Sequence, residues 1–115
     1  MNIRDIIKHR IMVLDGAMGT MIQKYSLTEN DFRGTRFADS AVEMKGNNDM
    51  LNITRQDVIE DIHRKYLVAG ADIISTNTFS SQRISQADYA LGEYSREMAF
   101  EGARIARRVA DEFST

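Results

Sequence analysis

One stretch, TRQDVIEDIHRKYLVAGADIIS at 54–75, restricts the fold more than any other part of the chain. Thr54 and Asp57 resemble a capping box, the apolar residues that follow recur at helical spacing, and Gly70 supplies a left-handed helix stop. A short apolar run at 73–74 comes directly afterwards. Because a helix, a glycine stop and a buried apolar run form an αβ step, the sequence predicts a helix that ends at Gly70 and then a strand. The apolar stripe of the predicted helix consists of Val58, Ile59, Ile62 and Tyr66.

An earlier apolar run, IMVL at 11–14, contains β-branched residues and shows no amphipathic alternation. This pattern is typical of a strand that is buried on both faces of a parallel sheet. The residues before it have isoleucines at helical spacing and end in cations, which predicts a short N-terminal helix. Residues 20–52 have poor periodicity and predict a long loop with one helical turn at 41–44. Helical patterns return at 83–91 and 93–113, the latter with Tyr94, Met98, Gly102, Ile105 and Val109 on one side.

The predicted order is helix, strand, long loop, helix, strand, helix, helix, an α/β arrangement with about two βα units after an N-terminal helix. Two parallel strands leave two unpaired edges and too little area to shield both faces of the sheet. We therefore expect either that the chain self-associates as a homo-oligomer or that it is the opening portion of a larger βα array.

Charge and composition narrow the classes of partner. The sequence has 15 basic and 17 acidic residues, so no global field draws it to nucleic acid or to an anionic membrane. The N-terminus MNIRDIIKHR lacks the apolar core of a signal peptide, and no apolar run is long enough to cross a bilayer, so we expect a cytoplasmic location. The absence of cysteine excludes thiol nucleophiles and thiolate-ligated zinc built from this chain alone.

The stretch VLDGAMGT at 13–20 delivers Asp15, Gly16 and Ala17 to the C-terminal end of the first predicted strand. In parallel α/β folds the ligand site lies beyond this end, where bare backbone amides can meet an anion and a carboxylate can meet a cation. A ligand with both charges, such as an amino acid, would suit these residues. The alternative is that Asp15 caps the turn and the glycines only fit the bend.

The stretch STNTF at 75–79 occupies the matching end of the second predicted strand. Its hydroxyl and amide groups, which include those of Thr76, Asn77 and Thr78, could orient a polar ligand by neutral hydrogen bonds. The alternative is that they cap the next helix. Glu60 and His63 form an E-x-x-H pair as in di-iron bundles, but such sites need two pairs, so we expect no metal site and a histidine on the flank of a helix.

Four segments, in the same order, closely resemble the start of the homocysteine S-methyltransferase family, and within it the cobalamin-dependent methionine synthase branch: VLDGAMGTMIQ, DFRGTRFAD, KGNNDMLNIT and AGADIISTNTFSSQRISQADY. The resemblance implies a (βα)8 TIM-type barrel in which three cysteine thiolates hold zinc, and the zinc binds the homocysteine sulfur. It also implies that the methyl group comes from methylcobalamin, which is bound to a separate module. The cobalamin is methylated again by methyltetrahydrofolate, which is bound to another module.

Matched by position, Asp15 and Gly16 correspond to the family's Asp-Gly that holds the homocysteine amino and carboxylate groups, and residues 76–78 correspond to the second-strand motif of the same pocket. Ala17, which follows Gly16, is predicted to bind substrate together with Asp15 and Gly16. The resemblance thus predicts substrate-binding residues and no catalytic residue in this chain.

A complete barrel takes about 250 residues, so the resemblance implies that residues 1–115 are an incomplete N-terminal segment of a homocysteine-binding domain. As part of the full-length protein this segment would serve methyl transfer to homocysteine to form methionine. It would do so together with the remaining barrel strands and the cobalamin and folate modules. Alone, we expect it to bind neither zinc nor cobalamin and to show no turnover. The alternative is a self-assembling or partner-completed barrel fragment that binds a small polar ligand without catalysis.

Overall fold

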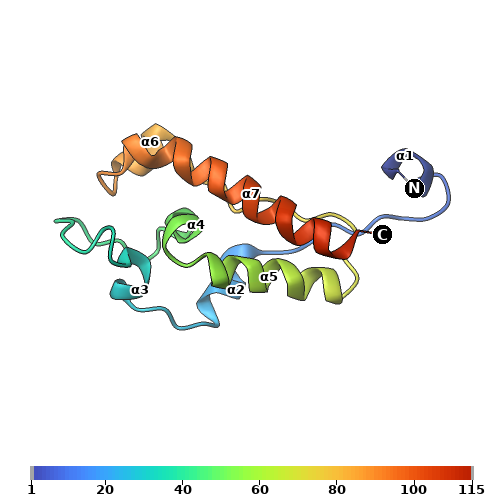
Figure 1. The fold of residues 1–115 in the computed structure, drawn as a ribbon, viewed down its shortest axis with the longest axis horizontal. Helices are drawn as coiled ribbons and strands as arrows, with labels where there is room; N and C mark the ends of the chain where they lie inside the picture. The colour runs from blue at the N-terminus through green and yellow to red at the C-terminus, as the bar shows by residue number, and fades with distance from the viewer. Residues whose placement is uncertain (1, 115) are drawn as a thin grey trace.

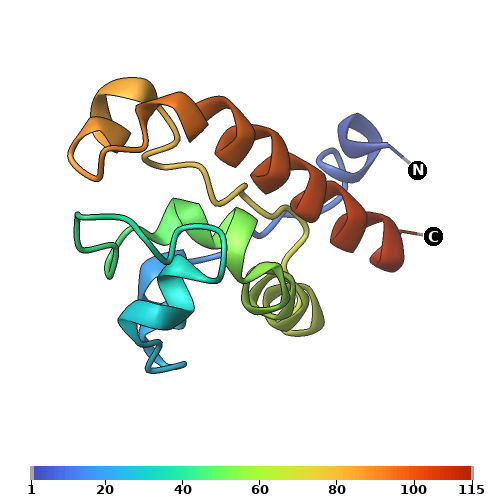
Figure 2. The same cartoon turned by 60° about the vertical axis from the view of Figure 1, so that its left-hand side comes forward.

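Two amphipathic helices, α5 (Gln56–Val68) and α7 (Ser95–Phe113), lie side by side and form the centre of the molecule (Figures 1 and 2). The structure, a computed structural model, describes residues 2–114. The apolar stripes of α5 and α7 face each other, because burial of apolar side chains is the main favourable contribution to folding. Both stripes follow the sequence prediction, except that Tyr66 and Tyr94 are only half-buried. The side chains that are at most 2% exposed include Val58, Ile59, Ile62, Met98, Ile105 and Val109.

The other helices of the described residues are shorter. The segment predicted as a long loop contains several of them, and the helical turn expected at 41–44 is not formed. Thr28 begins one of these helices with a capping box, because its hydroxyl accepts from the backbone N–H of Asp31 (3.2 Å) and its own N–H donates to the Asp31 carboxylate (2.8 Å). The shorter elements are α1 (Ile3–Ile6), α2 (Met18–Gln23), α3 (Glu29–Arg33), η1 (Asn48–Met50), α4 (Leu51–Thr54), α6 (Arg83–Ala87) and η2 (Gly92–Tyr94).

The ends of α5 differ from the prediction in one respect. Gly70 has a φ of +115°, so the left-handed helix stop is confirmed. The prediction of a capping box between Thr54 and Asp57 is wrong. The Thr54 hydroxyl donates to the carbonyl of Met50 (3.2 Å), and the Asp57 carboxylate pairs with Arg55 (3.0 Å). Thr54 ends the preceding helix α4, and its hydroxyl is therefore directed back into that helix.

The prediction of an α/β fold, with two βα units of a (βα)8 barrel, is wrong for the described residues 2–114. They contain no strand or sheet, and 55% of the structure is helical. Only a single parallel bridge joins Leu14 to Ile73, with hydrogen bonds from Asp15 N to Ile73 O (2.9 Å) and from Ile73 N to Val13 O (3.3 Å). The two segments do run parallel at that point, as predicted.

The apolar run at 11–14 fails to form a strand because nothing in the described chain covers it. The exposed fractions of Ile11, Val13 and Leu14 are 87%, 52% and 59%. A parallel sheet is stable when both of its faces are buried, and here the helices bury their apolar stripes against one another instead. Covering of this run by a second copy of the chain stays a prediction.

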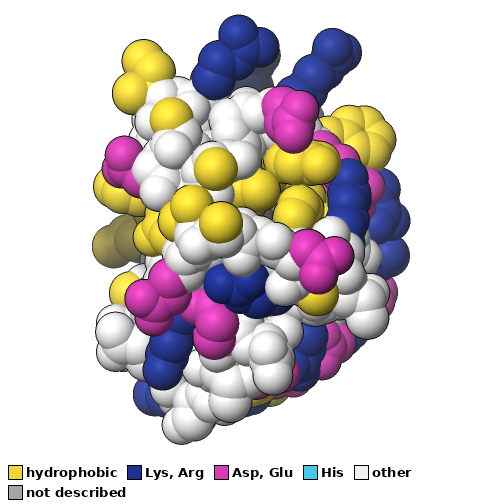
Figure 3. Space-filling view, turned by 90° about the vertical axis from the view of Figure 1, so that its left-hand side faces the viewer, with side chains coloured by type: hydrophobic (Ala, Val, Ile, Leu, Met, Phe, Trp, Pro, Cys, Tyr) yellow, Lys and Arg dark blue, Asp and Glu magenta, His cyan; other side chains and the backbone are white. Residues whose placement is uncertain are grey.

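The molecule is elongated, with extents of 52 × 26 × 20 Å, and α1 stands at one end on the extended segment that leads to Leu14 (Figure 1). At the opposite end, exposed hydrophobic side chains lie among charged side chains of both signs (Figure 3). Within residues 2–114, no helix combines the length and the apolar character needed to cross a membrane.

The extended segment that leads to Leu14 is held by hydrogen bonds to the carboxylate of Asp72. Asp72 accepts hydrogen bonds from both terminal nitrogens of Arg10 (2.8 and 2.7 Å) and from the backbone N–H of Val13 (2.8 Å). The hydrogen bond from Arg10 is the main cause that lowers the pKa of Asp72 from 3.8 to about 2, and Val13 adds to it. Because the folded-state pKa is depressed, the stabilisation is complete above the unfolded pKa of 3.8 and is lost as the pH falls through about 2.

We therefore expect the amide proton of Val13 to titrate with a midpoint near pH 2 in NMR spectra recorded from pH 5 downward. Asp72→Asn is the control, because it keeps an oxygen acceptor and removes the ionisation, so the Val13 shift should then be flat. A midpoint near the ordinary value of an exposed aspartate, about 4, would contradict this reading of the Arg10–Asp72 contact.

Candidate functional site

A cavity of about 630 Å³ opens between four segments that are far apart in the sequence. Its walls come from the turn at 15–19, the segment 46–49, the segment 75–80 and the region around α6, which contributes Ser85, Asp88 and Tyr89. The volume lies within the range of small-molecule sites in proteins, and most of the lining residues are polar or charged. The cavity can therefore take a small polar ligand.

Four of the six residues predicted to bind substrate line this cavity: Asp15, Gly16, Thr76 and Asn77. Ala17 lies beside it, and its carbonyl accepts a hydrogen bond from the Tyr66 hydroxyl (2.8 Å). The Thr78 hydroxyl lies 2.6 Å from that of Thr76. The structure thus brings together the two predicted groups of residues, and their binding of homocysteine stays a prediction.

Asp15 connects the two groups directly. Its Oδ2 accepts a hydrogen bond from the backbone N–H of Ser75 at 2.8 Å, and this carboxylate is half-buried at the cavity wall. The glycine that follows it lies close to α5, because a Cβ on Gly16 would stand 3.0 Å from the Tyr66 hydroxyl oxygen and the tyrosine would have to shift slightly. Tyr66 of α5 therefore supports the turn from behind, a contact that the local sequence pattern does not reveal.

Asn77 is fixed by a second asparagine. The Asn77 amide nitrogen donates to the side-chain oxygen of Asn52 and to the backbone carbonyl of Asn48, both at 3.0 Å. In return, the Asn52 amide donates to the carbonyls of Asn77 (2.7 Å) and Met98 (3.0 Å). The two side chains are 5% and 0% exposed, so these bonds satisfy polar groups that water cannot reach.

The segment 46–49, GNND, is the part of the site that sequence reasoning missed. It falls within the long loop predicted at 20–52, although two asparagines and an aspartate beside a glycine are a recognisable polar cluster. The amides of Asn47 and Gln86 bond each other in both directions (2.7 and 3.0 Å), which pins this segment to α6. Asp49 accepts from Ser80 N (2.8 Å) and Ser81 Oγ (2.6 Å) and is 3% exposed. Burial raises the pKa of Asp49, and these two hydrogen bonds partly oppose the rise.

The cavity is acidic. Three carboxylates, Asp15, Asp49 and Asp88, belong to its lining, and none of the described residues that line it is a lysine or an arginine. Such a wall attracts a cation, whereas an anionic group would have to rely on backbone N–H, hydroxyl and amide donors. The charge pattern therefore favours a small ligand that carries an ammonium group.

His63 is fully buried on α5, which differs from the expectation of a histidine on the flank of a helix. Neither of its ring nitrogens has a hydrogen-bond partner among the described residues. Burial lowers the pKa of His63, and the negative charge of Asp15 acts in the opposite direction. Its E-x-x-H companion, Glu60, forms ion pairs with Arg64 (3.6 Å) and Arg108 instead.

The donor set of this chain does not fit the zinc site that the family resemblance implies. That site needs three thiolates, and the sequence contains no cysteine. Within residues 2–114, no group of three histidine, aspartate or glutamate side chains could hold a metal ion. The residues present can hold and orient a polar ligand.

An acidic cavity of this size is large enough for a small polar ligand. The comparison with known families makes this more specific: a model of the homocysteine S-methyltransferase family matches residues 12–115. The chain belongs to the homocysteine S-methyltransferase family. This membership supports a function in methyl transfer to homocysteine, and the matched region contains every residue that lines the cavity.

Proposed function

We propose that residues 1–115 form the N-terminal segment of a homocysteine-binding domain of the cobalamin-dependent methionine synthase type. In this proposal the cavity holds the amino-acid end of homocysteine, and a methyl group is transferred to the homocysteine sulfur to give methionine. The observation that carries the proposal is the meeting of Asp15 and Asn77 in the wall of one acidic cavity, within a chain that belongs to this family.

The charges of the cavity suit the two ends of an amino acid differently. The ammonium group would lie against the carboxylates of Asp15 and Asp49, where opposite charges attract at short range. The carboxylate of the ligand would accept hydrogen bonds from the backbone N–H of Gly16 and from the Thr76 hydroxyl. Glycine has no side chain that could block the approach of the ligand to this N–H. The cobalamin and folate modules of the family would supply the methyl group, and this chain would bind and orient the acceptor.

The test compares three thiols by calorimetric titration of the chain: L-homocysteine, the same thiol without its carboxylate (aminopropanethiol), and the same thiol without its amine (mercaptobutyrate). Because the cavity is acidic, we expect loss of the amine to weaken binding about tenfold or more, which corresponds to about 1.4 kcal/mol. Loss of the carboxylate should weaken binding less. The absence of heat with millimolar homocysteine, or equal binding of mercaptobutyrate, would refute the proposal.

A matched pair of variants assigns the effect to the cavity. Asp15→Asn keeps an oxygen that can accept from Ser75 N and removes the charge, so homocysteine should bind more weakly while the fold is retained. Asp39→Asn removes the same charge from an exposed position outside the cavity lining and should leave binding unchanged. Equal effects of the two variants would indicate a general electrostatic influence and not a contact with the ligand.

A further inference from the structure

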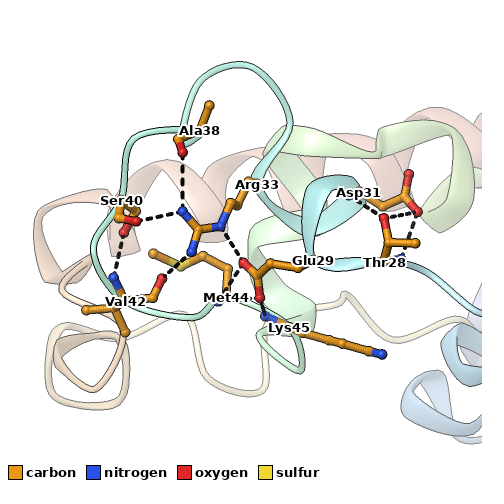
Figure 4. Close-up of polar contacts among 9 residues, drawn as sticks. All are labelled: Thr28, Glu29, Asp31, Arg33, Ala38, Ser40, Val42, Met44 and Lys45. Atoms are coloured by element: carbon orange, nitrogen blue, oxygen red, sulfur yellow. Dashed lines mark hydrogen bonds and ion pairs between the residues drawn. The ribbon is translucent and has the colours of Figure 1, made fainter.

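An ion pair outside the cavity holds the loop that leads into it. Arg33 and Glu29, one turn apart on α3, bond each other at 2.5 Å (Figure 4). Both side chains are largely buried, with exposed fractions of 17% and 30%. Neither residue belongs to the cavity lining. We call this pair the Glu29–Arg33 clamp.

The Arg33 half of the clamp binds carbonyls along a loop that has no regular structure. Its guanidinium donates to the carbonyl oxygens of Ala38 (3.3 Å), Ser40 (2.6 Å) and Val42 (3.0 Å), as Figure 4 shows. A guanidinium presents five donors in a fixed planar fork, so it can hold several carbonyls of one loop at the same time.

The Glu29 half of the clamp binds the amides that come next along the chain. Its Oε1 accepts from the backbone N–H groups of Lys45 (2.8 Å) and Met44 (2.9 Å) (Figure 4). Burial alone would raise the pKa of Glu29, yet the two backbone N–H groups and the guanidinium lower it overall. Glu29 therefore stays ionised at neutral pH and makes charge-assisted hydrogen bonds, which are stronger than neutral ones.

Gly46, the residue after Lys45, begins the segment 46–49 that forms part of the cavity wall. All four residues of the segment 46–49 line the cavity. Gly46 has a φ of +99°, a backbone conformation that residues with a side chain rarely adopt. The clamp thus fixes the chain up to the point where the wall begins. On the far side of the wall, Asn47 is bonded to α6 and the Asn48 carbonyl is bonded to Asn77.

We propose that Glu29 and Arg33 are positioning residues, which set the location of Gly46, Asn47 and Asn48 in the cavity wall and thereby the affinity for the amino-acid ligand. The ligand part of this inference rests on the proposed function. The loop part does not, because it follows from the five backbone contacts of the clamp.

The experiment uses Glu29→Ala, which removes both amide contacts, and Arg33→Lys, which keeps the charge and loses the planar fork. Amide hydrogen exchange is measured by NMR without ligand, and L-homocysteine binding is measured by calorimetry. In Glu29→Ala we expect the Asn47 amide to exchange about tenfold faster, the amides of α5 and α7 to be unaffected, and the dissociation constant for homocysteine to rise about tenfold. Arg33→Lys should show smaller changes of the same kind.

Asp111→Ala is the matched control, because it removes an exposed i,i+4 ion pair with Arg107 on α7, far from this loop in the sequence. It should change neither readout. Three results would overturn the inference: unchanged exchange at Asn47, faster exchange throughout α5 and α7, or a loosened loop with unaltered homocysteine affinity. If the unaltered chain binds no homocysteine, the proposed function fails, and the exchange measured without ligand still decides whether the clamp positions the wall.

Discussion

Replacement of Asn52 by alanine is expected to lower the free energy of unfolding by about 3 kcal/mol, because a buried polar group without a partner costs about 1–3 kcal/mol. The Asn52 side chain is 0% exposed and makes three hydrogen bonds, two to the carbonyls of Asn77 and Met98 and one from the Asn77 amide. The variant leaves these groups in a space that water does not reach. Urea denaturation followed by circular dichroism measures the change.

Asn30→Ala is the control for this prediction, since Asn30 is an exposed residue of α3 and its loss should cost within about 0.5 kcal/mol. Under the proposed function, the Asn52 variant should also bind homocysteine more weakly, because Asn77 is a lining residue of the cavity and its amide bonds to Asn52. A loss below about 1 kcal/mol would show that the Asn52–Asn77 contacts contribute little to the packing of α4 against α7.

Replacement of Gly102 by valine is expected to cost about 3 kcal/mol, at the upper end of what overpacking a core produces. Gly102 lies on the buried side of α7. A Cβ there would stand 2.7 Å from the Asn52 amide nitrogen and 2.8 Å from Cγ2 of Thr78. Both distances are shorter than real Cβ contacts, so the Asn52 and Thr78 side chains, or α7 itself, would have to shift. Thermal and urea unfolding would record the loss.

The neighbouring Ala103→Val provides the matched control. Ala103 is exposed on the same helix, so the variant carries only the lower helix propensity of a β-branched residue, about 0.5 kcal/mol. Equal destabilisation by the two variants would mean that the Gly102 position has no special steric role. The two largest expected effects thus concern one contact region, where α4, α7 and the segment at 75–80 meet beneath the cavity.

The two long helices could be predicted from sequence because their signal is local and repeated. Ile59 and Ile62 on α5, and Met98 and Ile105 on α7, recur at the spacing that puts them on one side of a helix, and all four are 0% exposed. The short helix α3 could also have been found, since Thr28 and Asp31 have the spacing of a capping box. Its weak apolar periodicity concealed it.

The strands were wrongly predicted because strand formation depends on distant partners. The run at 11–14 has the composition of a buried strand, but its side chains are buried only if other segments cover both faces. In the described chain α5 packs on α7, and Ile11 and Leu14 are left exposed, with one bridge from Leu14 to Ile73. Membership of the family and the fold of this chain are therefore separate conclusions, the first from sequence and the second from packing.

The family, the two main helices and the two polar groups of residues that include Asp15 and Asn77 could be inferred from the amino-acid sequence, because they depend on local pattern and on residue order. The packing of the helices was needed to show that 46–49 completes the cavity, that the wall is acidic, and that Glu29 and Arg33 hold the loop beside it. The cavity joins segments that lie tens of residues apart, and the clamp joins α3 to a loop that begins a few residues after it. Their contacts arise from helix packing and from the need to satisfy buried polar groups, which no local pattern encodes.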